Sequence, residues 1–512
     1  MYRQNEKETD NMNIAEAKQH VENAVKAYLA KDDEGYQLLP PEQQRPLFLL
    51  GAPGIGKTAI MAQIANELGI GLVAYSMTHH TRQSALGLPS IVHRTYDEGE
   101  FDVSEYTMSE IIASVYDYMA VTGRKTGILF LDEVNCVSET LYPSMLQFLQ
   151  FKTFGRHRVP DGWIVACAGN PPAYNKSVHD FDIVTLDRLR RIDIEPDFDA
   201  WKAYSLETGI HPAVLSFLDI RRECFYAVES TPTGKRFVSA RGWTDLSRII
   251  GVHERFGMPV ERTLIAQYVQ DPDIADAFAL YYDLFSKYRS DYQIDEILAG
   301  RASADIIERA KDAPFDERLA LMSLLLDGLS ACTSRELDQE RLVLAVRDEL
   351  RAAKEAAAAG EDPAEVLTRA ALERAQKLER DAATGTLPAD VAKRMQRTAA
   401  FLHDAAAACT DTASSSADPL AGATDAYGRE VAALEALRDD ASAQLDAAFS
   451  FVEEAFGADR ELLVFATELT ARTDCALFIA RFGCAAYDRA SEGLMVDEQR
   501  ADLLAQMAEL DL

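Results

Sequence analysis

An eight-residue loop between two apolar segments constrains the fold of this chain more than any other feature. The loop, Gly51-Ala-Pro-Gly-Ile-Gly-Lys57-Thr58, directly follows the apolar run 47–50 and precedes an amphipathic run that begins at Ala59. Its glycines let consecutive backbone N–H groups turn toward one centre, and the N-terminus of a following helix adds positive potential there. The pattern G-x-x-x-x-G-K-T between a strand and a helix is typical of nucleotide-binding α/β domains.

We therefore predict that this loop holds the phosphates of a nucleotide. The residues assigned to nucleotide binding in the loop are Gly51, Ala52, Pro53, Gly54, Ile55, Gly56, Lys57 and Thr58. Lys57 is expected to reach the β- and γ-phosphates, and the Thr58 hydroxyl is expected to hold Mg²⁺.

A second apolar run ends in two adjacent carboxylates. Residues 127–131 are Gly-Ile-Leu-Phe-Leu, and Asp132 and Glu133 follow directly. The run reads as a buried parallel strand, which would deliver both side chains to the sheet edge where ligands bind. We predict that Asp132 steadies Mg²⁺ through water and that Glu133 orients and partly deprotonates the attacking water.

Two further polar segments fit a hydrolytic site. Asn170 follows the strand predicted at 163–168, so its amide would emerge beside a γ-phosphate, although Asn-Pro also simply begins turns. Residues 186–191, Leu-Asp-Arg-Leu-Arg-Arg, form a cationic segment in an acidic chain. An arginine can stabilise the charge of a phosphoryl-transfer transition state, and a solvated basic face is the alternative.

The order of elements predicts an α/β domain with a parallel sheet, because apolar strand-like runs alternate with helical patterns. We expect an N-terminal helical segment (1–44), the α/β nucleotide-binding domain (45–197), a helical lid (198–300) and a mainly α-helical, acidic, alanine-rich C-terminal region (301–512). Residues 77–104 are longer than a connection requires and indicate an insertion. A flexible linker is expected near 410–425, between helices predicted at 388–409 and 428–456 that would pair antiparallel.

Charge and cysteine content bound the function. The net charge is −31, of which residues 301–512 carry −18, so the surface repels phosphate backbones and nucleic acid is not an expected partner. The seven cysteines contain no C-x-x-C pair, which is typical of reduced, buried thiols. No apolar run reaches the length of a membrane helix, and residues 1–8 lack a signal-peptide pattern. We expect a cytoplasmic protein without a membrane partner.

Five motifs in this order resemble those of AAA+ ATPases. They are Gly51 to Thr58, Asp132-Glu133-Val-Asn135, Ala168-Gly-Asn170-Pro, Leu186-Asp-Arg188 and Ser239-Ala-Arg241-Gly. The Asp-Glu-Val-Asn and Gly-Asn-Pro sequences are closest to the MoxR-like, dynein-related branch. The resemblance covers about residues 45–300.

The resemblance implies roles for single residues. Asn170 looks like sensor 1, Arg241 like the sensor 2 arginine of the lid, and Arg188 like the arginine finger that reaches a neighbouring subunit's nucleotide. Arg190 and Arg191 are near enough to take the finger role instead. A finger acting in trans implies a ring, usually a hexamer in this family. The insertion falls where MoxR-like proteins carry a helix-2 insertion, and many members act beside a protein with a von Willebrand factor A domain.

The leading hypothesis is an oligomeric ATPase, dependent on ATP and Mg²⁺, that remodels a protein partner in the manner of a MoxR-like chaperone. Glu133, Asn170, Arg188 and Arg241 are its predicted catalytic residues. One alternative is a nucleotide-gated assembly scaffold with little turnover. Another is a nucleic-acid-stimulated NTPase, against which the acidic charge counts.

Overall fold

The computed structural model describes residues 11–79, 83, 85, 87–174, 178–179, 181–231, 234–383, 389–412, 419–457 and 460–491. The chain forms two compact units, each considered separately below. Unit 1 comprises Met1–Trp201, Ser239–Arg241 and Glu379–Pro388, and unit 2 comprises Lys202–Val238, Gly242–Leu378 and Ala389–Leu512.

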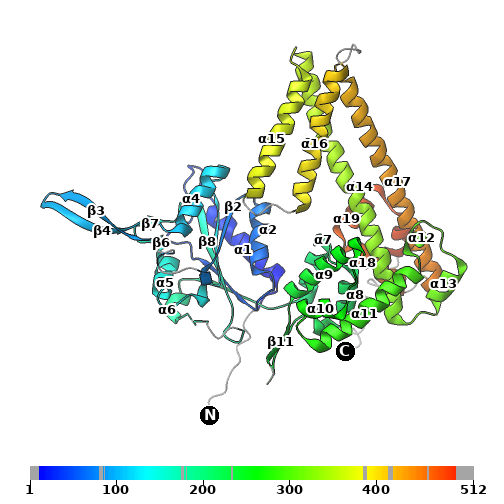
Figure 1. Cartoon of the computed structure of the whole chain (residues 1–512), viewed down its shortest axis with the longest axis horizontal. Helices are drawn as coiled ribbons and strands as arrows, with labels where there is room; N and C mark the ends of the chain where they lie inside the picture. The colour runs from blue at the N-terminus through cyan, green and yellow to red at the C-terminus, as the bar shows by residue number, and fades with distance from the viewer. Residues whose placement is uncertain are drawn as a thin grey trace, which may run out of the picture. The chain divides into compact units, whose positions relative to one another are not determined.

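Unit 1 contains the predicted α/β domain (Figure 1). Its helices are α1 Ile14–Leu29, α2 Lys57–Glu67, α4 Glu110–Thr122, α5 Tyr142–Phe151 and α6 Ile183–Leu186. Its strands are β1 Leu47–Gly51, β2 Gly71–Ser76, β3 Pro89–Tyr96, β4 Gly99–Tyr106, β5 Gly127–Asp132, β6 Thr153–Phe154, β7 His157–Arg158, β8 Trp163–Gly169 and β9 Arg190–Ile194. Helix α7, Phe198–Thr208, begins in unit 1 and continues into unit 2.

A five-stranded sheet in the order β2-β5-β8-β1-β9 organises this unit, and all its strand pairs are parallel. The central strands are buried on both faces because every residue of β8 and the first five residues of β5 are buried. Helices α4 and α5 bury apolar side chains against one face, and α2 contacts β2 and β5. The register pairs Leu131 with Cys167 and Leu50 with Gly169, so β5, β8 and β1 end together at one sheet edge.

The N-terminal helix forms as its sequence predicts. Asn13 and Glu16 make a reciprocal capping box at the start of α1, which satisfies backbone donors at its first turn. The apolar positions Ala17, Val21 and Val25 are fully buried, and α1 contacts α2 and β9. This segment is therefore part of unit 1.

The predicted insertion contains an antiparallel hairpin. Strands β3 and β4 pair from Pro89–Tyr106 to Tyr96–Gly99, and they project away from the five-stranded sheet (Figure 1). Every residue of β3 is exposed, including Ile91 and Val92. Helix α4 begins at Glu110, after the hairpin ends, and the Ser109 side chain caps its first turn.

Unit 2 is mainly helical. Its helices after α7 are α8 Pro212–Ile220, α9 Ala240–Phe256, α10 Arg262–Tyr268, α11 Pro272–Asp291, α12 Ile294–Leu298, α13 Ala304–Lys311, α14 Phe315–Ala358, α15 Pro363–Ala383, α16 Ala389–Thr412, α17 Ala421–Phe456, α18 Arg460–Thr470 and α19 Thr473–Phe482. Strands β10 Ala227–Thr231 and β11 Gly234–Val238 form a hairpin that the prediction of an all-helical lid missed. Helices α9 and α15 each have a few residues assigned to unit 1.

The boundary predicted at residue 300 does not separate two compact units. Helix α14 packs along α17 and also contacts α8, α11 and α12 of the predicted lid, so one apolar stripe joins both regions. Helices α16 and α17 contact each other (Figure 1). The linker predicted at 410–425 is shorter than expected, since α16 reaches Thr412 and α17 starts at Ala421, and residues 413–418 of it lie outside the described part of the chain.

Candidate functional site

The phosphate loop follows β1 and ends at the N-terminus of α2. Gly54 and Gly56 have φ values of 75° and 103°, in the left-handed region that favours glycine. A Cβ added to Gly51 would lie 2.6 Å from the Ile194 carbonyl oxygen on β9. The backbone N–H of Arg241, the predicted sensor 2 arginine, donates to the Gly54 carbonyl at 3.1 Å. This bond places the Arg241 backbone beside the loop.

Lys57 is held inside the loop. Its side chain is buried, with 8% of the residue exposed, and Nζ donates to the carbonyl oxygens of Gly51 and Ala52, each at 2.8 Å. A third bond joins Nζ to Asn170 Oδ1 at 3.1 Å. Burial lowers the pKa of Lys57 to about 8; nearby Asp132 opposes this shift and Arg241 adds to it. Burial makes the positive charge of the Lys57 ammonium group unfavourable, and an anion bound in the loop would stabilise that charge.

Thr58 and Asp132 meet across the loop. The Thr58 Oγ1 donates to Asp132 Oδ2 at 2.8 Å, which joins a residue of α2 to the last residue of β5. These two side chains are the ones predicted for Mg²⁺. Their oxygens are of the hard type that Mg²⁺ prefers, and they lie beside the loop that would hold the phosphates. The donor set therefore fits a magnesium nucleotide.

Glu133 adopts an unusual backbone conformation beside Asp132. Its φ of 57° is left-handed for a non-glycine residue, and its N–H donates to Asp132 Oδ1 at 2.9 Å. The carboxylate Oε2 accepts from Ser76 Oγ at 3.3 Å and Thr78 Oγ1 at 3.1 Å. The hydroxyls of Ser76, the last residue of β2, and of Thr78, in the turn that follows, thus hold the carboxylate predicted to activate water.

Asn135 brackets Asn170 at the same sheet edge. Its Nδ2 donates to the Asn170 carbonyl at 2.9 Å, and its Oδ1 accepts from the Asn170 N–H at 3.3 Å. A Cβ on Gly169 would lie 2.6 Å from Asn135 Oδ1, so this strand end requires glycine for the close approach. Asn135 therefore positions Asn170 against Lys57.

The three arginines of the cationic segment differ in their surroundings. Arg191 is bound to Asp193 through Nε and Nη2, at 2.9 and 2.8 Å, and Arg190 begins β9 with a half-buried side chain. Arg188 lies in the turn after α6 and is exposed. Arg188 is not among the residues that contact Lys57 or Thr58 in the described part of the chain.

Three contributors to this site were not predicted from the sequence. Ser76 and Thr78 contact Glu133 because β2 pairs with β5, which places Ser76 opposite Asp132. Asn135 belongs to the Asp-Glu-Val-Asn motif, from which no role for its own side chain was predicted. No local pattern marks Ser76 or Thr78, since their importance depends on strand order. The Asp-Glu-Val-Asn spacing was the available signal for Asn135.

Residues 47–150 match the family model described as the ATPase family associated with various cellular activities (AAA). The match spans the phosphate loop, Asp132 and Glu133. Together with the five-stranded parallel sheet and the mainly helical remainder, it identifies an α/β AAA+ fold, and it supports ATPase activity with nucleotide binding. A search of curated proteins finds no match to the sequence.

Two further findings concern the described residues only. No helix among them is long and apolar enough to cross a membrane. Within the same part of the chain, no group of three or more His, Cys, Asp or Glu side chains gathers as a metal cluster.

Proposed function

We propose that this protein hydrolyses ATP with Mg²⁺ in an oligomeric ring and uses the reaction to remodel a protein partner, in the manner of a MoxR-like AAA+ chaperone. One observation carries the proposal: the side chains of Lys57, Thr58, Asp132, Glu133 and Asn170 converge at one edge of the parallel sheet. These are the side chains that phosphate binding, metal binding and water activation require.

Each of these side chains has a distinct part in the proposed reaction: metal binding, phosphate binding or proton transfer. Thr58 and, through water, Asp132 would hold Mg²⁺, which would supply positive charge to the phosphate oxygens. Lys57 would donate to phosphate oxygens in place of the carbonyls of Gly51 and Ala52. Glu133, once released from Ser76 and Thr78, would orient a water molecule and accept its proton. The Asn170 amide, held by Asn135, would fix that water and the γ-phosphate.

The proposal of a ring rests on the exposed position of Arg188. Its side chain is exposed, whereas Arg191 is engaged by Asp193. An exposed arginine that acts on a neighbouring subunit's γ-phosphate makes each site depend on the next subunit, and such head-to-tail contacts close into rings.

The exposed β3–β4 hairpin, with Ile91 and Phe101, is proposed to contact the protein substrate. A partner with a von Willebrand factor A domain is the kind that the family resemblance suggests.

The proposal is tested by replacing Glu133 with Gln. We expect ATP to remain bound while turnover falls by at least about a hundredfold, because the general base is lost and the phosphate contacts stay. Turnover is measured by phosphate release and binding by calorimetry. Glu139→Gln, which changes an exposed carboxylate in the same stretch, is the matched control and should leave both unchanged. Full turnover by Glu133→Gln would refute the assignment.

A nucleotide-gated scaffold is the second candidate, and one observation favours it. Ser76 and Thr78 engage the Glu133 carboxylate, an arrangement that would slow water activation. The two candidates differ in what a non-hydrolysable ATP analogue achieves. Stable partner capture with the analogue alone, together with negligible turnover of wild-type protein, would favour the scaffold over the remodelling enzyme.

A further inference from the structure

Unit 2 contains a polar pocket that the proposed ATPase reaction does not use. It is open to solvent, has a volume of about 430 Å³ and is formed by α7, α8, α9, α11, α14 and the turn between α18 and α19. The polar side chains that line it include Ser205, His211, Glu254, Arg289, Asp327 and Arg472. This volume lies in the range of small-molecule sites.

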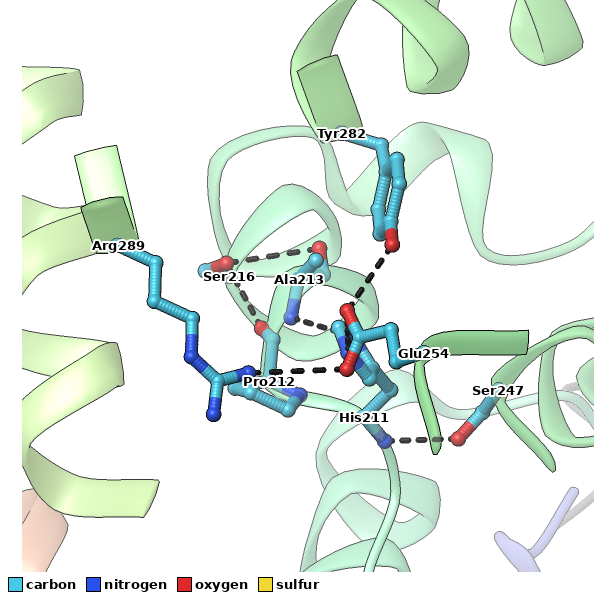
Figure 2. Close-up of polar contacts among 8 residues, drawn as sticks. All are labelled: His211, Pro212, Ala213, Ser216, Ser247, Glu254, Tyr282 and Arg289. Atoms are coloured by element: carbon cyan, nitrogen blue, oxygen red, sulfur yellow. Dashed lines mark hydrogen bonds and ion pairs between the residues drawn. The ribbon is translucent and has the colours of Figure 1, made fainter. Parts of the chain in front are cut away.

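Glu254 organises one side of the pocket (Figure 2). Its Oε1 accepts from Tyr282 OH at 2.9 Å and lies 3.1 Å from His211 Nε2, while Oε2 lies 3.6 Å from Arg289 Nη1. The His211 Nδ1 accepts from the Ala213 N–H at 3.2 Å, as the cap of α8. With Nδ1 acting as an acceptor, Nε2 is the ring nitrogen that faces Glu254. Both oxygens of the Glu254 carboxylate therefore already have partners within the protein: Tyr282, His211 and Arg289.

Arg472 on the opposite side is buried without such compensation. Only 8% of the residue is exposed, its Nε has no hydrogen-bond partner, and no carboxylate among the described residues lies within ion-pair distance of its guanidinium. The fully buried Ser205 hydroxyl also lacks a partner there. A buried guanidinium with unused donors is costly, so proteins normally pair it with an anion.

Asp327 is the complementary group of the pocket. Its carboxylate is half-buried, and burial raises its pKa from the ordinary value, while the nearby guanidinium of Arg472 opposes the rise. Asp327 forms no ion pair within the described part of the chain. The pocket thus contains one cation and one anion that remain available, in contrast to the paired Arg289 and Glu254.

The charges on the lining select the ligand class. Among the three arginines and two carboxylates that line the pocket, Arg289 is paired with Glu254, and Arg248 lies 3.2 Å from Asp245, a carboxylate outside the lining. Arg472 and Asp327 remain, one positive and one negative charge. A multiply charged phosphate would meet the Asp327 carboxylate, whereas a ligand with one carboxylate and one ammonium group matches both remaining charges. We propose that this pocket binds a small zwitterion of the α-amino acid class, with its carboxylate on Arg472 and its ammonium group on Asp327.

The test uses the full chain and the twenty standard L-amino acids, each added separately. Thermal unfolding identifies those that stabilise the protein, and calorimetry measures their affinity. We expect saturable binding by at least one amino acid and a loss of affinity of about tenfold or more in Arg472→Gln, because a charged hydrogen bond is removed. Arg262→Gln changes an exposed arginine of unit 2 that does not line the pocket, and it should bind like wild type.

Asp327→Asn keeps the shape of the side chain and removes its charge, so it tests recognition of the ligand's ammonium group separately from recognition of its carboxylate. It should weaken the amino acid by a similar factor but leave binding of the matched carboxylic acid, which lacks the ammonium group, unchanged. Absence of binding by all twenty amino acids, or binding that survives both substitutions, would overturn the proposal.

Inorganic phosphate is tested in a Lys57→Ala background, which disables the phosphate loop. Phosphate binding that depends on Arg472 and exceeds every amino acid would overturn the ligand class.

Discussion

Lys57 shows how one buried residue can couple nucleotide binding to pH. Its pKa is about 8 because burial disfavours the ammonium form, although Asp132 lies nearby. Between about pH 8 and its ordinary value of 10.5, the unfolded chain binds more protons at this site than the folded one. The contribution of Lys57 to the free energy of unfolding therefore rises with pH across that window. Phosphates in the loop should raise the pKa again.

Proton uptake on ATP binding should follow. At a pH about half a unit above 8, free Lys57 is mostly deprotonated, so binding should take up about three quarters of a proton. One unit below 8, the uptake at this site should fall to about a tenth of a proton. The measurement is calorimetry in two buffers of different ionisation enthalpy. Lys57→Met, at saturating ATP, should abolish the difference; an equal uptake in that variant would exclude Lys57 as its source.

At the scale of the element, α14 and α17 show how the acidic helical region is held together. Glu336 on α14 is completely buried, and its Oε1 accepts from Arg438 of α17 through Nε and Nη2, at 3.2 and 3.1 Å. The Arg438 guanidinium also lies 4.1 Å from the centre of the Phe482 ring. The second Glu336 oxygen has no partner. Such a pair is costly to break, because one buried charge then remains uncompensated.

Arg438→Met should destabilise unit 2 by about 3 kcal/mol, since Glu336 would keep its burial and lose its partner. Urea unfolding followed by circular dichroism measures the change. The double variant Glu336→Leu/Arg438→Met should recover most of the loss, because it removes both charges and keeps apolar volume. If the double variant were as unstable as the single one, packing of Arg438 on Phe482 would be the dominant contribution instead.

At the scale of the whole molecule, the proposed ring makes catalysis a property of neighbouring subunits. Glu133 would act on the nucleotide of its own subunit, while Arg188 would act on that of the next one. Two inactive variants can then repair each other when they assemble together. This holds only if the finger acts between subunits, so the experiment separates a ring from a self-sufficient monomer.

Equal mixtures of Glu133→Gln and Arg188→Ala should regain ATPase activity. In randomly mixed rings, about one quarter of the sites combine an intact Glu133 with a neighbour's intact Arg188. Phosphate release by the mixture is compared with that of each variant alone. Arg191→Ala, whose arginine is bound to Asp193, should retain more activity than Arg188→Ala. No recovery on mixing, with assembly verified by mass in solution, would argue against a finger in trans.

Local patterns were sufficient for the parts of this protein in which the chemistry is contiguous. The loop from Gly51 to Thr58, the strand that ends at Asp132 and the capped helix α1 were predictable, because turn residues, apolar runs and caps act over a few residues. The parallel sheet followed from alternating elements. The β3–β4 hairpin was not predictable, since all its β3 residues are exposed and no buried face leaves a pattern.

Contacts between distant segments depended on the packing of the elements. Strand order brings Ser76 and Thr78 to Glu133, and it brings Asn170 to Lys57, although 113 residues separate the last two in sequence. Helix packing places Arg472 near Asp327 and Arg438 against Glu336. Sequence periodicity indicates which helix face is buried but not which helix covers it. Residue chemistry and local order therefore come from the chain itself, whereas the partners of each functional group come from the tertiary fold.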